Sequence, residues 1–176
     1  MPRDPNTLQD VNIDGVWATT GGQNGERFLL DDNGVDADER IIIFATDNNL
    51  RRLSQAEVWF MDGTFSSAPN IFMQLYVILV KSGDLIVPAV FALLQRKTQT
   101  TYQNLLRVLV EKCEEQDLHL DPDRVVIDFE AAVINAIPTV LGNGVIVQGC
   151  FFHLCQSTFR KVQQLGMVQR YAISIN

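Results

Sequence analysis

The chain has 176 residues, of which 47% are hydrophobic and 20% are charged, and its formal net charge is −7. This length predicts one domain with at most a small attachment, and the apolar fraction is typical of a globular protein. Three cysteines are too few for a disulfide framework, and no apolar stretch approaches the roughly 20 residues of a membrane-spanning helix. We therefore expect an intracellular protein, nuclear or cytoplasmic, that is not secreted and has no membrane partner. The acidity argues against simple electrostatic binding to nucleic acid.

Residues 1–56 are expected to form an acidic, partly flexible leader. Residues 1–57 carry eleven Asp or Glu against five Lys or Arg, and the first 26 residues are rich in Asn, Gly and Thr. The leader is also expected to contain short elements, which are strands over 27–30 and 40–45 and a helix over 46–57.

Residues 57–176 are expected to form the folded core. Strand patterns occur at 57–62, 71–80, 85–94, 123–129 and 145–147, and amphipathic helix patterns at 98–116, 130–141 and 152–165. The strand over 71–80 is almost continuously apolar, which predicts burial on both faces. Pro88 lacks a backbone N–H, so the strand that contains it is expected at an edge of the sheet.

These core elements run in the order β-β-β-α-β-α-β-α, and the later alternation requires right-handed parallel crossovers. This is the order of the ribonuclease H-like fold, so we predict an α/β protein with a mixed five-stranded sheet of that kind. In that architecture the first strand and the strand after the first long helix lie side by side. Asp62 and Asp128, near the C-terminal ends of these two strands, are therefore expected to be neighbours.

A divalent cation would remove the repulsion between two adjacent carboxylates. Mg²⁺ prefers oxygen ligands and is usually held by one or two carboxylates together with waters and substrate phosphate. Asp62 and Asp128 are thus candidate metal ligands for phosphoryl transfer. The alternative is that both are ordinary turn or helix-capping residues, because Asp62 precedes a glycine and Asp128 precedes a helix.

Several short motifs, in their order and spacing, resemble the MULE transposase domain of Mutator-like elements. They are WFMDGTF at 59–65, PNIFMQLY at 69–76, ALLQRKT at 92–98, TY at 101–102, DFEAA at 128–132, QGCFFH at 148–153, Gln156, and RK at 160–161. FATDNNLR at 44–51 is similar to the lead-in of animal members. The resemblance covers roughly residues 27–170.

The resemblance implies a DDE-type transposase core, which cleaves DNA and joins its ends with Mg²⁺ or Mn²⁺ held by two aspartates and one glutamate. Asp62 matches the first acid and Asp128 the second. The third acid of the family lies beyond an all-helical insertion that begins after the Cys-x-x-His segment. No residue of this chain matches the third acid, so we expect a partial core, truncated before the insertion and inactive by itself.

The implied partner is DNA, both transposon ends and target, and formation of a homo-oligomer stays open. An alternative hypothesis is a non-catalytic, domesticated or decayed transposon-derived interaction protein, so whether the chain is an enzyme also stays open. A third hypothesis, a compact ribonuclease H-like nuclease with another acid set, is weakened because residues 150–176 contain no Asp or Glu.

Other charged residues near these motifs receive less specific interpretations. Glu130 is expected to support the N-terminus of the following helix through the helix dipole rather than to bind metal. Asp84, in a hairpin turn, is expected to be solvated. Arg96, Lys97 and Arg107 are expected to be surface charges.

Cys150 and His153 form a Cys-x-x-His pair, but we expect no zinc, because structural zinc needs four ligands. Cys155 is expected on the buried face of its helix, and His119 lies in an exposed connection. The helix after Cys150 also carries a polar stripe, formed by His153, Gln156, Arg160 and Gln163. The family resemblance implies that the Cys-x-x-His segment lies near the active site, so this stripe, together with Cys150, either faces DNA there or is an ordinary solvated face.

Overall fold

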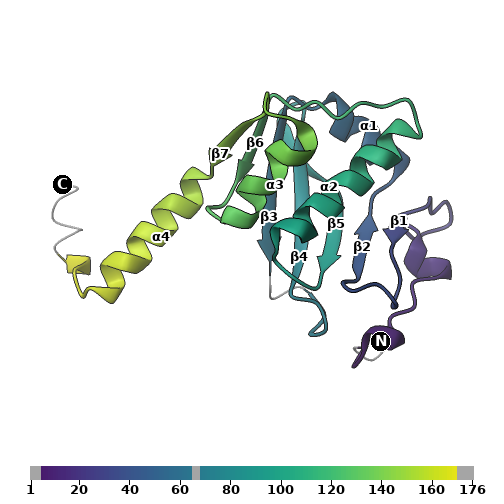
Figure 1. Ribbon diagram of the computed structural model, residues 1–176, viewed down its shortest axis with the longest axis horizontal. Helices are drawn as coiled ribbons and strands as arrows, with labels where there is room; N and C mark the ends of the chain where they lie inside the picture. The colour runs from purple at the N-terminus through teal and green to yellow at the C-terminus, as the bar shows by residue number, and fades with distance from the viewer. Residues whose placement is uncertain (1–4, 65–67, 170–176) are drawn as a thin grey trace.

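A computed structural model of the chain describes residues 5–64 and 68–169 and contains one seven-stranded sheet (Figure 1). Its strand order is β1-β2-β5-β4-β3-β6-β7. The strands are β1 (Leu29–Asp32), β2 (Ile41–Phe44), β3 (Val58–Thr64), β4 (Gln74–Ser82), β5 (Leu85–Leu94), β6 (Arg124–Ile127) and β7 (Ile146–Gly149). Within the described residues, the α-helices are α1 (Asp47–Gln55), α2 (Gln99–Glu114), α3 (Ala131–Leu141) and α4 (Phe151–Gln164), and short 3-10 helices span Leu8–Asp10 and Gly15–Ala18.

The expected α/β class is confirmed, and the sheet is mixed, but it has seven strands where the sequence predicted five. Strand β4 is antiparallel to β3 and to β5, whereas β6 and β7 continue the sheet in parallel from β3. The additional strands β1 and β2 come from the expected leader, and β2 pairs with β5 from Ile41 opposite Leu94 to Phe44 opposite Phe91. The proposed division of the chain at residue 57 stays a prediction.

Helices α1, α2 and α3 lie on one face of the sheet (Figure 1). Leu105, Leu106 and Leu109 of α2 are fully buried there, because its apolar residues recur with helical spacing. Trp59 of β3 is also fully buried, and its indole N–H donates to the backbone oxygen of Leu53 in α1 at 3.1 Å. The core of the protein therefore lies between the three helices and one face of the sheet.

Burial of the strand over 71–80 differs from the expectation. In β4 the burial alternates, so that Tyr76, Ile78 and Val80 are buried and the residues between them are only half-buried. The prediction of burial on both faces was wrong because helices cover only the face toward which these three side chains point. The continuous apolar pattern did not show which face would be covered.

The edge position predicted from Pro88 was also wrong, because β5 lies between β2 and β4. However, β2 pairs only with the second half of β5, from Phe91 to Leu94, so Pro88 has a partner strand on one side. A register shift between Ile78 and Leu79 occurs opposite this proline. The missing N–H is thus accommodated at a β-bulge in the half of β5 that β2 does not reach.

Helix α4 leaves the body of the molecule along its own axis (Figure 1). None of its residues is buried, and Phe151, Phe152 and Phe159 are exposed. The expected burial of Cys155 was wrong, since this thiol is exposed. An amphipathic pattern predicts an apolar face but not its packing partner, and no described element covers this one.

Candidate functional site

The parallel pairing of β3 with β6 places the two candidate aspartates at one end of the sheet. Val58 pairs with Arg124 and Phe60 with Val126, and continuing this register by two residues brings Asp62 opposite Asp128. In β3, Met61 is buried and Asp62 is exposed, so the alternation of strand side chains directs the Asp62 carboxylate to the face away from α1, α2 and α3, whereas Asp128 directly follows the last residue of β6. Neighbouring strands are about 4.8 Å apart, which makes the two residues close neighbours.

Both carboxylates are oriented by backbone donors. Oδ1 of Asp62 accepts a hydrogen bond from the N–H of Gly63 at 2.8 Å, and Oδ1 of Asp128 accepts one from the N–H of Glu130 at 3.1 Å. Within the described part of the chain, Oδ2 of neither aspartate receives a hydrogen bond. Asp128 therefore also has the turn-stabilising role of the alternative interpretation, and both aspartates keep one oxygen available for a ligand.

The beginning of α4 is fixed beside Asp128. The N–H of Cys150 donates to the backbone oxygen of Ile127 at 2.6 Å, and Cys150 is the N-cap of α4. The ring of Phe129 packs so closely on Gly149 that a Cβ there would lie 2.6 Å from a ring carbon. These two contacts set the position from which α4 extends away from the sheet.

His153, in the first turn of α4, lies beside Asp62. Its Nε2 is 3.8 Å from Oδ1 of Asp62, and its Nδ1 is buried with no hydrogen-bond partner in the described structure. The sequence placed His153 near the active site only through the family resemblance, and the structure brings it to the first aspartate.

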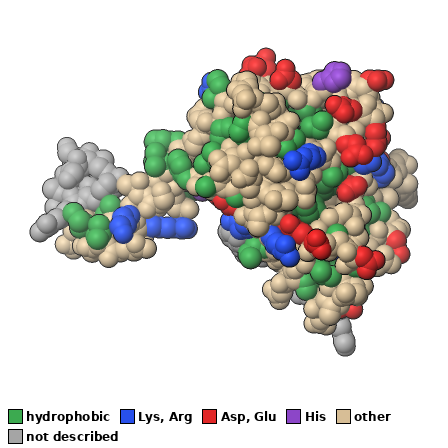
Figure 2. Space-filling model, viewed as in Figure 1, with side chains coloured by type: hydrophobic (Ala, Val, Ile, Leu, Met, Phe, Trp, Pro, Cys, Tyr) green, Lys and Arg blue, Asp and Glu red, His purple; other side chains and the backbone are tan. Residues whose placement is uncertain are grey.

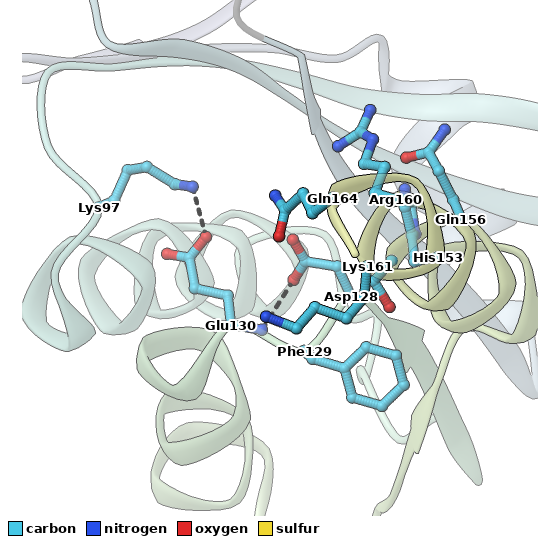
Figure 3. Close-up of a pocket in the computed structure, with 10 residues that line it drawn as sticks. Lys97, Asp128, Phe129, Glu130, His153, Gln156, Arg160, Lys161 and Gln164 are labelled. Atoms are coloured by element: carbon cyan, nitrogen blue, oxygen red, sulfur yellow. Dashed lines mark hydrogen bonds and ion pairs between the residues drawn. The ribbon is translucent and has the colours of Figure 1, made fainter. Parts of the chain in front are cut away.

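An open cleft of about 540 Å³ lies between α4 and the ends of β6 and α3 (Figure 3). It is lined by Lys97, Asp128, Phe129, Glu130, His153, Gln156, Ser157, Arg160, Lys161 and Gln164. Of the predicted polar stripe, His153, Gln156 and Arg160 face the cleft, but Gln163 does not line it. Gln164 is there instead, because a residue eleven positions after His153 shares its helix face and one ten positions after it does not.

Lys97 is not the simple surface charge that the sequence predicted. Its Nζ is 2.6 Å from Oε2 of Glu130, and both side chains are largely buried, with exposures of 29% and 19%. In contrast, Arg96, Arg107 and Asp84 are exposed as expected. The sequence did not predict the ion pair of Lys97 with Glu130, because it joins the loop before α2 to the loop before α3. No sequence spacing indicates such a contact.

Glu130 is the N-cap of α3, but its side chain forms no capping hydrogen bond. Instead, its Oε1 accepts a hydrogen bond from the hydroxyl of Tyr102 at 2.8 Å, and that hydroxyl accepts one from Nε2 of Gln74 at 2.8 Å. The side chain of Glu130 therefore makes specific side-chain contacts, and its expected support of α3 through the helix dipole stays a prediction. A polar Gln74 in an otherwise apolar strand was the one signal in the sequence that pointed to them.

The carboxylates also affect two buried tyrosines beneath them. Burial raises the pKa of Tyr76 well above its usual value, and the nearby Tyr102 adds to this rise. The charges of Asp128, Glu130 and Asp62 contribute in the same direction. Burial likewise raises the pKa of Tyr102, with a further contribution from Glu130. Tyr102 therefore keeps its proton at neutral pH and is the donor to Glu130.

No group of three or more His, Cys, Asp or Glu side chains in the described residues is placed to hold a metal ion. Cys113 is buried in α2, whereas Cys150 lies at the start of α4 and His119 is exposed in the connection before β6. A cation at Asp62 and Asp128 would therefore complete its coordination with water and phosphate oxygens, as Mg²⁺ commonly does.

Comparison with known families identifies the class of protein to which this sheet and cleft belong. Residues 58–157 match the family model of the MULE transposase domain, a region that runs from β3 into α4 and includes both aspartates. Because the match spans more than half of the chain, the protein belongs to the MULE transposase domain family. A search of curated proteins finds no match. In the described part of the chain, no helix is long and apolar enough to cross a bilayer.

Proposed function

We propose that the chain provides the two-aspartate part of a DDE-type DNA transposase core, with Asp62 and Asp128 as ligands of Mg²⁺ or Mn²⁺. The observation that supports this proposal is the β3–β6 register, whose continuation brings residues 62 and 128 opposite each other inside the region that matches the family. When bound, a divalent cation would activate a water nucleophile and stabilise the charge that develops on the transferred phosphoryl group.

The chemistry of the donors fits such an ion. Each aspartate is held through Oδ1 by a backbone N–H and keeps Oδ2 for a ligand. The side chain of Asp62 is 53% exposed, so water and phosphate can reach it. Two hard oxygen donors from neighbouring strands are typical of Mg²⁺ and Mn²⁺ sites and poor for zinc.

The polar side of α4 supports DNA as the substrate. Arg160 and Lys161 bring positive charge to the cleft opposite Asp128, and Gln156 and Gln164 add hydrogen-bond donors for phosphate oxygens (Figure 3). Residues 150–176 contain no acid, although the whole chain has a net charge of −7. We propose that a DNA strand lies between α4 and the two aspartates, where local cations offset the repulsion of the rest of the molecule.

Full DDE chemistry uses a third acid, and no residue of this chain is assigned to it. Glu130 lines the same cleft as Asp128, but both of its oxygens are already engaged by Lys97 and Tyr102. We therefore expect these 176 residues to bind metal and DNA but to cleave and join strands more slowly by orders of magnitude, because each 1.36 kcal/mol of lost transition-state stabilisation costs about tenfold in rate.

The test is the thermal stability of the purified protein with and without Mn²⁺. Asp62→Asn and Asp128→Asn each keep an Oδ1 that accepts the backbone hydrogen bond but lose the charge that attracts a cation. We expect Mn²⁺ to raise the melting temperature of the wild type and not of either variant. The matched control is Asp84→Asn, at an exposed turn between β4 and β5, which should respond as the wild type does.

Equal stabilisation of Asp62→Asn and the wild type by Mn²⁺ would exclude the proposed site. No response of the wild type at millimolar Mn²⁺ would instead favour a non-catalytic interaction protein. If the 176-residue chain joins DNA strands and Asp62→Ala abolishes this activity, the chain contains a complete set of catalytic carboxylates.

A further inference from the structure

We propose that Tyr102, Glu130 and Lys97 are positioning residues for Asp128, which hold its carboxylate in the orientation that binds the metal. This inference rests on the proposed metal site and assigns a role to three residues around it. Glu130 links the group to Asp128, because its backbone N–H donates to Oδ1 of Asp128 while its side chain pairs with Lys97 (Figure 3). The same side chain also accepts a hydrogen bond from Tyr102.

The side chain of Glu130 has little freedom to move. Oε2 pairs with Nζ of Lys97 at 2.6 Å, and Oε1 accepts from the hydroxyl of Tyr102 at 2.8 Å. Lys97 precedes α2, Tyr102 belongs to α2 and Glu130 precedes α3, so the contacts join two helices and a connecting loop. Charge-assisted hydrogen bonds of this kind fix geometry more strongly than neutral ones.

The anchor of this group is inside the core. Tyr102 is fully buried, and its hydroxyl accepts a hydrogen bond from Nε2 of Gln74, which is 1% exposed. The amide oxygen of Gln74, Oε1, lies against Gly63. A Cβ added to Gly63 would be 2.3 Å from this oxygen. Gly63 directly follows Asp62, so a continuous row of contacts connects the strand of the first aspartate to the backbone donor of the second.

Positioning explains Glu130 better than metal ligation does. A carboxylate with both oxygens engaged by Lys97 and Tyr102 would have to give up one of these donors to bind a cation. Its backbone N–H already reaches Asp128 without any rearrangement. Outer contacts that orient a metal ligand commonly change metal affinity by about 10–100-fold.

The two roles predict opposite results for Tyr102→Phe, a neutral change that removes one hydroxyl. If Glu130 positions Asp128, losing the hydroxyl loosens Glu130 and weakens Mn²⁺ binding by about tenfold. If Glu130 is itself a ligand, the same change releases Oε1 and strengthens binding. Isothermal titration of the 176-residue chain with MnCl₂ measures the difference.

Thr101→Val is the matched control. Thr101 precedes Tyr102 in α2, is also fully buried, and its hydroxyl also donates to a glutamate, Glu39, at 2.7 Å. Glu39 lies in the connection between β1 and β2 and has no hydrogen bond to Asp128 in the described structure. The control therefore removes a hydrogen bond to a glutamate from the same helix, together with the acceptor of the Thr98 N–H in the capping box of α2, and should still leave Mn²⁺ affinity unchanged.

A second readout without metal separates positioning from general loss of stability. In an amide NMR spectrum of the metal-free protein, Tyr102→Phe should shift the N–H signal of Glu130, and Thr101→Val should not. The positioning role alone would be overturned if the wild type binds Mn²⁺ and Tyr102→Phe binds it with the same affinity and leaves the Glu130 signal unshifted. Stronger binding in Tyr102→Phe would also overturn it. A wild type that does not bind Mn²⁺ would overturn the metal site itself, and the positioning role with it.

Discussion

At the level of single residues, the site depends on a glycine next to the first aspartate. Gly63 lies in β3 with Tyr76 opposite it in β4, and its N–H donates to Asp62. An added Cβ would lie 2.3 Å from Oε1 of Gln74 and 3.2 Å from the ring of Tyr76. A glycine is needed here because of this close approach and not because of its backbone angles.

We predict that Gly63→Ala destabilises the protein by about 1–3 kcal/mol, as overpacking in a well-filled core does. It should also displace Gln74 and lower Mn²⁺ affinity, since Gln74 donates to Tyr102. Chemical denaturation with and without Mn²⁺ measures both effects. Gly144→Ala is the control, because a Cβ there meets no atom within 4 Å. Equal stability of the two variants would contradict the proposed packing.

At the level of elements, the added strands β1 and β2 are connected to the N-terminal segment by a buried arginine. Arg40 is 4% exposed, and its guanidinium donates to both carboxylate oxygens of Asp32, at 3.0 and 2.6 Å. It also donates to the backbone oxygens of Leu8 and Val11, at 2.6 and 3.1 Å. One side chain thus holds the first 3-10 helix against β1.

We predict that Arg40→Met costs about 2 kcal/mol or more of stability, because it leaves the half-buried Asp32 and two backbone oxygens without their donors. Limited proteolysis should then cleave the segment before β1 first. The control is Arg27→Met, which removes an exposed pair with Asp47 at 2.9 Å and should cost less than about 1 kcal/mol. Equal proteolysis of both variants would show that Arg40 does not hold this segment.

The same pair makes stability depend on acid pH. Burial by itself raises the pKa of Asp32, but hydrogen bonds from Arg40 and Gly34 outweigh it and hold the pKa below its ordinary value. The stabilisation is therefore complete above the unfolded pKa of about 3.9 and is lost as the pH falls through the lower folded pKa. Arg40→Met should lessen this acid-dependent loss, which denaturation at a series of pH values measures.

At the level of the whole molecule, the charges are unevenly distributed. Acidic side chains gather over the body of the protein, whereas the protruding α4 presents Lys and Arg beside exposed apolar side chains (Figure 2). Residues 1–57 alone carry eleven acids against five basic residues. DNA binding by this chain would therefore depend on the few cations at the cleft more than on its overall field.

We predict that Arg160→Ala combined with Lys161→Ala weakens DNA binding and reduces the slope of log affinity against log salt concentration by about two, since each phosphate contact contributes about one. Fluorescence anisotropy of a labelled duplex at several KCl concentrations measures the slope. Lys81→Ala, at the exposed end of β4, removes a positive charge far from the cleft in the fold and should leave the slope unchanged. An unchanged slope in the double variant would exclude α4 as the DNA-binding surface.

Local patterns in the sequence predicted most elements well. The helix expected over 98–116 is α2, and the hairpin expected from 71 to 94 is formed by β4 and β5, because helical spacing and the turn at Ser82 to Leu85 depend on neighbouring residues alone. The two strands next to Asp62 and Asp128 were likewise identified from short apolar runs, although β3 continues two residues beyond Asp62 to Thr64 and β6 ends one residue before Asp128. Their role as metal ligands stays a prediction.

Burial and long-range contacts could not be predicted from local sequence patterns, because they depend on how distant segments pack together. The pattern of β4 did not show that helices cover only one face of the sheet, and the amphipathic pattern of α4 did not show that its apolar side lacks a described partner. The contacts of Tyr102 with Gln74 and Glu130 join residues 28 positions apart in both directions, and Lys97 pairs with Glu130 although α2 and β6 lie between them in the sequence. Periodicity and composition indicate which face of a segment is apolar. Which other segment packs against that face depends on how the whole chain folds around one core.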